Sequence, residues 1–127
     1  MIYCVDSDKS FIEAVADLEA VILRLGFAIL ASHDVGATLR GKGVDIDEEC
    51  AVFDVCNARL AGRLLAVDMN LSLTLPWRIT VATDHGVTRI GLIRPQPVLA
   101  ALSSATGPVS VAAEIEERLI QMVNESR

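Results

Sequence analysis

The side chains most able to do chemistry gather around one point of the sequence, where Cys56 and Asn57 follow a run of strand-forming residues. A helix is expected to begin there, and the first N–H groups of a helix point outward without partners and favour an anion such as a thiolate. Asp54 shares a strand face with Cys56, two residues earlier, and His33 ends the preceding predicted strand. Cys56, Asn57, Asp54 and His33 are therefore the candidate ligand-binding residues.

Two interpretations of this strand–helix junction stay open. In the first, the chain is a non-enzymatic binding or assembly domain that takes a small ligand or a partner near the helix start. In the second, it is a thiol-dependent enzyme or redox sensor that uses Cys56. A pocket in which Asp54, Cys56 and His33 converge would favour the second interpretation, and a filled, dry junction would favour the first. No His or Lys adjoins Cys56 in the sequence to accept its proton, and no catalytic residue is assigned.

No metal or phosphate motif is present in the sequence, and it names no cofactor. The three cysteines and two histidines lack the close paired spacings of zinc sites. Gly41-Lys42-Gly43 is too short for a phosphate-binding loop and follows a predicted helix. Cys50 and Cys56 lie roughly 20 Å apart in one predicted strand, too far for a disulfide. An odd number of cysteines without a CxxC motif indicates free thiols and a reducing, cytoplasmic location.

Composition predicts one domain, residues 1–127, with an aliphatic core. Hydrophobic residues make up 52% of the 127 residues and aromatic residues 4%. So many apolar residues on a small domain favour a subunit interface, and a homodimer is expected. The net charge of −6 and the scattered basic residues argue against nucleic-acid binding. No apolar run is long enough to span a membrane, which leaves a small molecule or a second copy as the expected partners.

Hydrophobic periodicity and capping residues predict the elements that must position these groups. In the first half of the chain the predicted strands are Ile2–Val5, a central strand at Phe27–Ser32, and Cys50–Cys56. The first predicted helix lies between the capping box Ser10/Glu13 and Gly26. A short helix follows Asp34 at Val35–Arg40, and another, capped by Asn57, runs from Ala58 to about Val67. In the strand at Cys50–Cys56, Ala51, Phe53 and Val55 are expected on one face, and the two end cysteines and Asp54 on the other.

In the second half, the alternation of Leu71, Leu73 and Leu75 predicts a half-buried strand. A hairpin follows with a two-residue turn at His85-Gly86, which places Val81 opposite Ile90 and Ile79 opposite Leu92. A short helix is expected at Val98–Leu102, a loop at 103–108, and a last helix carrying Val111, Ile115, Leu119, Met122 and Val123 on its buried stripe. These elements together predict an α+β fold, a largely antiparallel or mixed sheet with helices packed on one face.

Several stretches resemble the family catalogued as domain of unknown function 302. The likeness rests on Gly26-Phe27, on Asp34-Val35 with Thr38-Leu39, on Cys56-Asn57 with Leu60-Ala61, and on Leu73-Thr74-Leu75-Pro76 leading into a hairpin, and it covers about residues 1 to 123. The resemblance implies a compact α+β domain, a homodimer in some members, with no established reaction. Ala58 stands where the family usually has proline, and Trp77 where it usually has a second cysteine, so a chemistry needing two cysteines is not carried over.

Overall fold

A single five-stranded antiparallel sheet forms the centre of the molecule, in a computed structural model that describes residues 1–103 and 109–127. The strand order is β1-β5-β4-β3-β2. The strands are β1 (Ile2–Ser7), β2 (Ala28–Asp34), β3 (Cys50–Cys56), β4 (Trp77–Asp84) and β5 (Val87–Ile93). The predicted α+β class is therefore confirmed. The loop predicted at 103–108 lies, apart from its first residue, outside the described residues.

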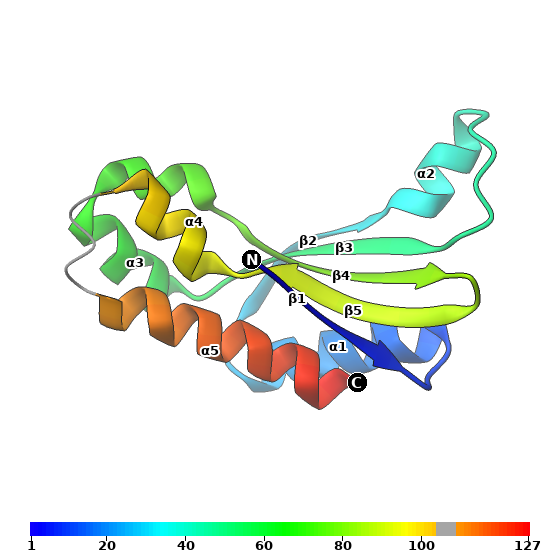
Figure 1. Ribbon diagram of the computed structural model, residues 1–127, viewed down its shortest axis with the longest axis horizontal. Helices are drawn as coiled ribbons and strands as arrows, with labels where there is room; N and C mark the ends of the chain where they lie inside the picture. Colours follow the sequence, from blue (N-terminus) through cyan, green and yellow to red (C-terminus); the bar gives the residue numbers. More distant parts are fainter. Residues whose placement is uncertain (104–108) are drawn as a thin grey trace.

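Helices cover one face of this sheet and gather beyond one of its ends, and α2 lies at the other end (Figure 1). They are α1 (Phe11–Arg24), α2 (Val35–Gly41), α3 (Ala58–Val67), the 3-10 helix η1 (Met69–Thr74), α4 (Pro95–Leu102) and α5 (Val109–Ser126). The helices α1 and α5 pack on each other and on the sheet, whereas α3, η1 and α4 lie together beyond its end. The opposite face of the sheet has no helix over it in Figure 1.

The core lies between the sheet and the α1–α5 layer. Every second residue of β3 and β4 points into it: Ala51, Phe53, Val55, Trp77, Ile79 and Val81 are all buried. From the helices come Leu18 and Ile22 of α1 and Ile115, Leu119 and Met122 of α5, each at most 1% exposed. The strand period of two and the helix period of 3.6 thus bury the residues that the pattern predicted.

Local capping signals act as the sequence indicates. The Ser10 hydroxyl accepts the Glu13 N–H at 3.2 Å and also donates to the Glu13 carboxylate, so Ser10 caps the start of α1. The Asp34 carboxylate likewise accepts the Ala37 N–H at 2.9 Å and starts α2. The hairpin turn is also confirmed, because His85 and Gly86 both have positive φ, as a type I′ turn requires, and Asp84 pairs with Val87.

One predicted element and the predicted position of another are wrong. The strand expected at Leu71–Leu75 is the 3-10 helix η1, because Asp68 accepts the Asn70 N–H and the Thr74 hydroxyl donates to the Leu71 carbonyl, so polar side chains stabilise tight local turns. The strand expected to be central is β2, which lies at the sheet edge. Its Leu30 is 60% exposed, and a bulge between Ile29 and Ala31 interrupts its pairing with β3.

The β4–β5 pairing ends before the two strands do. It runs from Asp84–Val87 through Val81–Ile90 to Thr80–Gly91, so the predicted register is confirmed over this stretch. The predicted Ile79–Leu92 pair is not formed, although both side chains are buried on the core side. Beyond Thr80, β4 stays paired with β3 as far as Trp77, while β5 stays paired with β1 as far as Ile93. The two halves of the sheet therefore diverge at the end nearest η1 and α4.

Candidate functional site

The strand–helix junction is built as the sequence predicts, and Asn57 is fully engaged in it. Its side-chain oxygen accepts the Leu60 N–H at 3.0 Å, and its amide nitrogen donates to the Gly26 carbonyl at 3.1 Å. Asn57 thus caps α3 and ties its start to the turn between α1 and β2, where Gly26 has φ +83°. Both polar atoms of the side chain already have a partner within the fold.

Of the other three predicted residues, the structure brings two together. His33 Nε2 and Asp54 Oδ2 lie 2.8 Å apart on the sheet face that no helix covers, with Asp54 only 18% exposed. Cys56 shares this face and is half-buried, but none of the described hydrogen bonds joins its thiol to His33 or Asp54. The described residues include no group of three or more His, Cys, Asp or Glu side chains placed to hold a metal ion.

A cavity of about 650 Å³ lies elsewhere, at the end of the sheet where β4 and β5 diverge. Its lining includes side chains from the uncovered face, Ile2, Val52, Arg78, Thr80 and Ile93, and also the core-side residues Trp77, Leu92 and Leu119. Because neighbouring strand residues point to opposite faces, a lining that includes both Trp77 and Arg78 brings residues of both sheet faces to this cavity, at the gap between the diverging strands. We call this cavity the through-sheet pocket.

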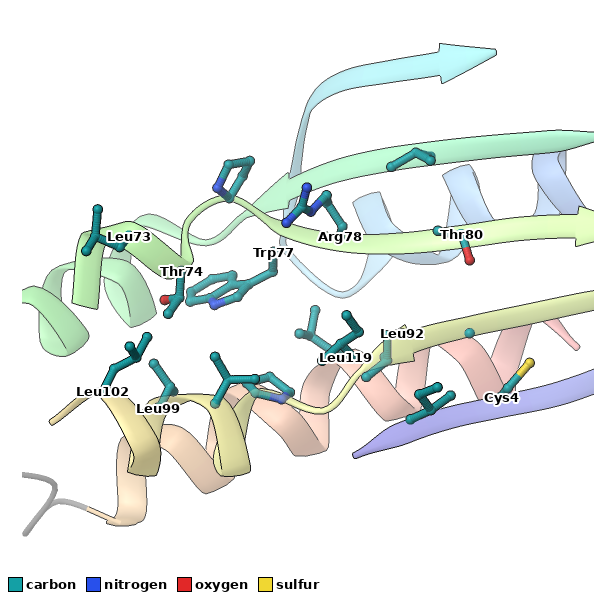
Figure 2. Close-up of a pocket in the computed structure, with 17 residues that line it drawn as sticks. Cys4, Leu73, Thr74, Trp77, Arg78, Thr80, Leu92, Leu99, Leu102 and Leu119 are labelled. Atoms are coloured by element: carbon teal, nitrogen blue, oxygen red, sulfur yellow. The ribbon is translucent and has the colours of Figure 1, made fainter. Parts of the chain in front are cut away.

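The elements η1 and α4 close the through-sheet pocket on the side away from the strands. Thr74 and Pro76 line it from the η1 segment, and Val98, Leu99 and Leu102 from α4. Figure 2 shows the Trp77 indole projecting from β4 between η1 and α4, with Leu99 and Leu102 directed toward it from the α4 side. The Trp77 ring also packs on Phe27 at a centroid distance of 6.2 Å, which fixes its far side.

The wall formed by α4 is held in place by a buried carboxylate. Glu116 of α5 is 4% exposed and accepts hydrogen bonds from Arg94 and from the Gln96 side chain, at 3.1 and 2.7 Å, at the start of α4. Burial alone raises the Glu116 pKa, but these hydrogen bonds outweigh it and place the pKa below its usual value. Glu116 therefore stays ionised at neutral pH and anchors α4 to α5.

Two groups of the through-sheet pocket lack partners among the described residues. Trp77 is 4% exposed, and its Nε1–H makes no hydrogen bond. Arg78, on the next position of β4, is exposed, and its guanidinium makes no ion pair or hydrogen bond with another described residue. A buried indole N–H normally finds an acceptor, and leaving one unpaired costs about 1–3 kcal/mol.

Sequence reasoning missed this pocket, and none of Cys56, Asn57, Asp54 and His33 lines it. One signal was available. The chain has a single tryptophan, placed directly after Leu-Pro at the start of a strand, where its N–H needs a partner that strand pairing does not supply. The divergence of β4 from β5 had no local signal, since it depends on how η1 and α4 pack.

Comparisons with known proteins identify a family. A family model described as "Domain of unknown function DUF302" matches residues 3–126. A solved structure, the crystal structure of an uncharacterized conserved DUF302 protein from Bacillus stearothermophilus, superposes with a TM-score of 0.91 at 28% sequence identity over 99% of this chain and 98% of that chain. A search of curated proteins found no match. Among the described residues no helix is long and apolar enough to cross a membrane. The chain belongs to the DUF302 family.

Proposed function

We propose that this chain is a non-enzymatic binding domain, a homodimer in solution, that holds a small apolar ligand in the through-sheet pocket. The pocket volume of about 650 Å³ falls within the range of small-molecule sites, roughly 300–1,000 Å³. Its walls are mostly aliphatic side chains from four strands, η1 and two helices. Such lining binds an apolar body, and a few polar groups then orient it.

The observation that carries this proposal is the buried Trp77 Nε1–H, which lacks an acceptor inside an apolar cavity. A ligand oxygen placed there would remove the cost of the unpaired donor. The ligand expected from this donor is apolar and carries a hydrogen-bond acceptor.

The junction at Cys56 and Asn57, with Asp54 and His33, stays a separate prediction. Its amide is occupied by capping, and its thiol is half-buried. The Cys56-dependent alternative is tested by thiol labelling, as argued in the Discussion.

The single tryptophan makes a direct test possible, because all tryptophan fluorescence reports on the pocket. Methyl nonyl ketone, a neutral apolar molecule with one carbonyl acceptor, should change Trp77 emission saturably. In an NMR spectrum of ¹⁵N-labelled protein the single indole N–H resonance should move downfield as it donates to the carbonyl. No saturable change with this ketone, with methyl naphthyl ketone, or with the carboxylic acids of the same two shapes, up to their solubility limits, would show that the pocket is not a binding site.

A matched pair of variants locates the binding. Val98→Phe fills the pocket from α4, and Val44→Phe makes the same change on a loop residue that is 48% exposed and does not line the pocket. We expect Val98→Phe to abolish the fluorescence change and Val44→Phe to leave it intact. Circular dichroism of both variants checks that the fold is retained.

A further inference from the structure

Arg78 occupies the mouth of the through-sheet pocket on the uncovered sheet face. Figure 2 shows its side chain leaving β4 and extending toward the η1 end of the pocket. The neighbouring arginines have carboxylate partners: Arg89 pairs with Asp6 and Asp84, and Arg94 with Glu116. Arg78 makes no such pair among the described residues, in a chain whose net charge is −6. A cation that has no ion-pair partner among the described residues, at the mouth of an apolar pocket, is an available site for an anion.

The acid nearest in register forms no ion pair with Arg78. Asp54 lies opposite Arg78 in the β3–β4 pairing, but its carboxylate is bound to His33 at 2.8 Å. Among the described residues that line the pocket none is Asp or Glu, and Arg78 is the one with a permanent charge. The electrostatics of the lining therefore favour a ligand with one negative charge.

We propose that the ligand of the through-sheet pocket is an apolar carboxylic acid, bound as its anion, with the carboxylate on the Arg78 guanidinium and the apolar body extending through the sheet toward Trp77. This inference rests on the proposed binding function and names the chemical class of its ligand. A guanidinium presents parallel N–H donors that match the two oxygens of a carboxylate, and such charge-assisted pairs are the strongest hydrogen bonds in proteins.

A phosphate head group fits the same mouth less well. Phosphate sites use several backbone N–H groups, commonly at a helix N-terminus, in addition to a cation. The helix start nearest the pocket is that of α4, where Pro95 and Pro97 have no N–H and the Gln96 N–H is already bonded to Glu116. A single guanidinium without a helix N-terminus beside it favours a monoanion.

The test compares acids with ketones of the same shape. Decanoate and methyl nonyl ketone share one alkyl chain and a carbonyl, and naphthoate and methyl naphthyl ketone form an equivalent aromatic pair. Trp77 fluorescence gives the dissociation constant of each at neutral pH. We expect the acid of at least one pair to bind about tenfold or more tightly than its ketone, as one charge-assisted hydrogen-bonded pair provides. The pair that shows this preference distinguishes an aliphatic from an aromatic ligand.

Two charge-matched variants test whether Arg78 causes the preference for the acid over the ketone. Arg78→Gln should remove it, leaving acid and ketone equal, while ketone affinity stays within about twofold of the parent, since the apolar contacts are unchanged. Lys42→Gln removes the same charge from an exposed residue outside the pocket and should keep the preference. Added salt should weaken the binding of the acid and leave the binding of the ketone unchanged.

The outcomes separate the two proposals. Ketones that bind without any preference for the acids, or a preference that survives Arg78→Gln, would overturn the carboxylate assignment and leave the apolar binding function standing. Failure of all four compounds to bind the parent protein would overturn both.

Discussion

Thr80 and Gly91 are the last residues that pair β4 with β5, and the sheet separates into two halves beyond them. Gly91 also lets β1 approach closely, because a Cβ at this position would lie 3.1 Å from both Cys4 Sγ and the Tyr3 carbonyl oxygen. The pocket thus begins where the ladder ends, with backbone on one side and the mouth residue Arg78 on the other. The paired part of the hairpin, as far as Thr80 and Gly91, thus belongs to the sheet, and its unpaired ends line the pocket.

The paired half of the hairpin should tolerate no charge on its core side. Val81 is fully buried opposite Ala51 and Ile90, so Val81→Asp leaves an unpaired charge in the core. We expect a loss of roughly 3–5 kcal/mol in the free energy of unfolding, or no folded protein. Urea denaturation followed by circular dichroism measures this.

Ala82→Asp provides the control on the adjacent position. Ala82 lies on the uncovered face opposite Arg89, where a carboxylate stays solvated. Ala82→Asp should therefore lower the free energy of unfolding far less than Val81→Asp does. Equal losses for the two variants would contradict the assignment of the faces.

Short-range signals predicted the hairpin and the helix caps, because the residues that determine them are close in sequence. The turn at His85-Gly86 fixes the register of its own strands, and Ser10, Asp34 and Asn57 each accept an N–H three residues ahead. The edge position of β2 and the separation of β4 from β5 depend on contacts distant in sequence. The 3-10 helix at Met69–Thr74 is held by local hydrogen bonds of Asp68 and Thr74, which the alternation of leucines in this stretch does not indicate. The pocket is a product of all such contacts, which explains why its residues had no recognisable motif.

Glu116 should make stability depend on pH through the anchoring of α4. Its folded-state pKa lies below the usual 4.5, so its stabilising effect is complete above the unfolded-state value and is lost as pH falls through the folded-state value. Glu116→Gln should lower the free energy of unfolding by about 1–3 kcal/mol at pH 7, because a buried charged partner of Arg94 is removed. Urea denaturation at several pH values measures the difference between parent and variant.

The sign of the pH effect provides the check. The difference should shrink at acidic pH, below 4.5, where the parent loses its own Glu116 charge. Glu114→Gln is the matched control, because Glu114 pairs with Arg59 and Arg63 at the surface and its removal should cost less. A Glu116→Gln difference that is the same at acidic and neutral pH would rule out the ionised anchor.

Dimerisation is predicted from exposed apolar side chains on the uncovered face, which also line the through-sheet pocket. On the uncovered face Ile2 is 76% exposed and Ile93 61% exposed, and they pair directly across β1 and β5. Sedimentation at micromolar concentration should give twice the chain mass of 13.6 kDa. A monomer throughout this range would contradict the homodimer.

Charged variants test where the two copies meet. Ile93→Glu places a charge on the uncovered face, and Ile12→Glu makes the same change on the 78% exposed outer side of α1. We expect Ile93→Glu to shift the protein to monomer and Ile12→Glu to leave the dimer intact. The opposite result would place the interface on the helical layer.

The last prediction uses the three cysteines to decide between the pocket and the strand–helix junction. Cys4 is exposed and lines the pocket, Cys56 is half-buried at the junction, and Cys50 lies at the far end of β3 from Cys56. Burial, and to a smaller extent the charge of Asp34, raises the pKa of the Cys50 thiol, which lowers its thiolate fraction. Iodoacetamide at neutral pH should therefore label Cys4 fastest, Cys56 slowly and Cys50 slowest, as read by mass spectrometry of the cysteine peptides.

Ligand protection then identifies the occupied site. Decanoate or methyl nonyl ketone in the through-sheet pocket should slow the labelling of Cys4 and leave the Cys56 rate unchanged, since only Cys4 lines the pocket. Cys56→Ser should accordingly lower stability without altering ligand affinity. Labelling of Cys56 faster than Cys4, or protection confined to Cys56, would favour thiol chemistry at the junction, because a reactive thiol must be both ionised and accessible to its substrate.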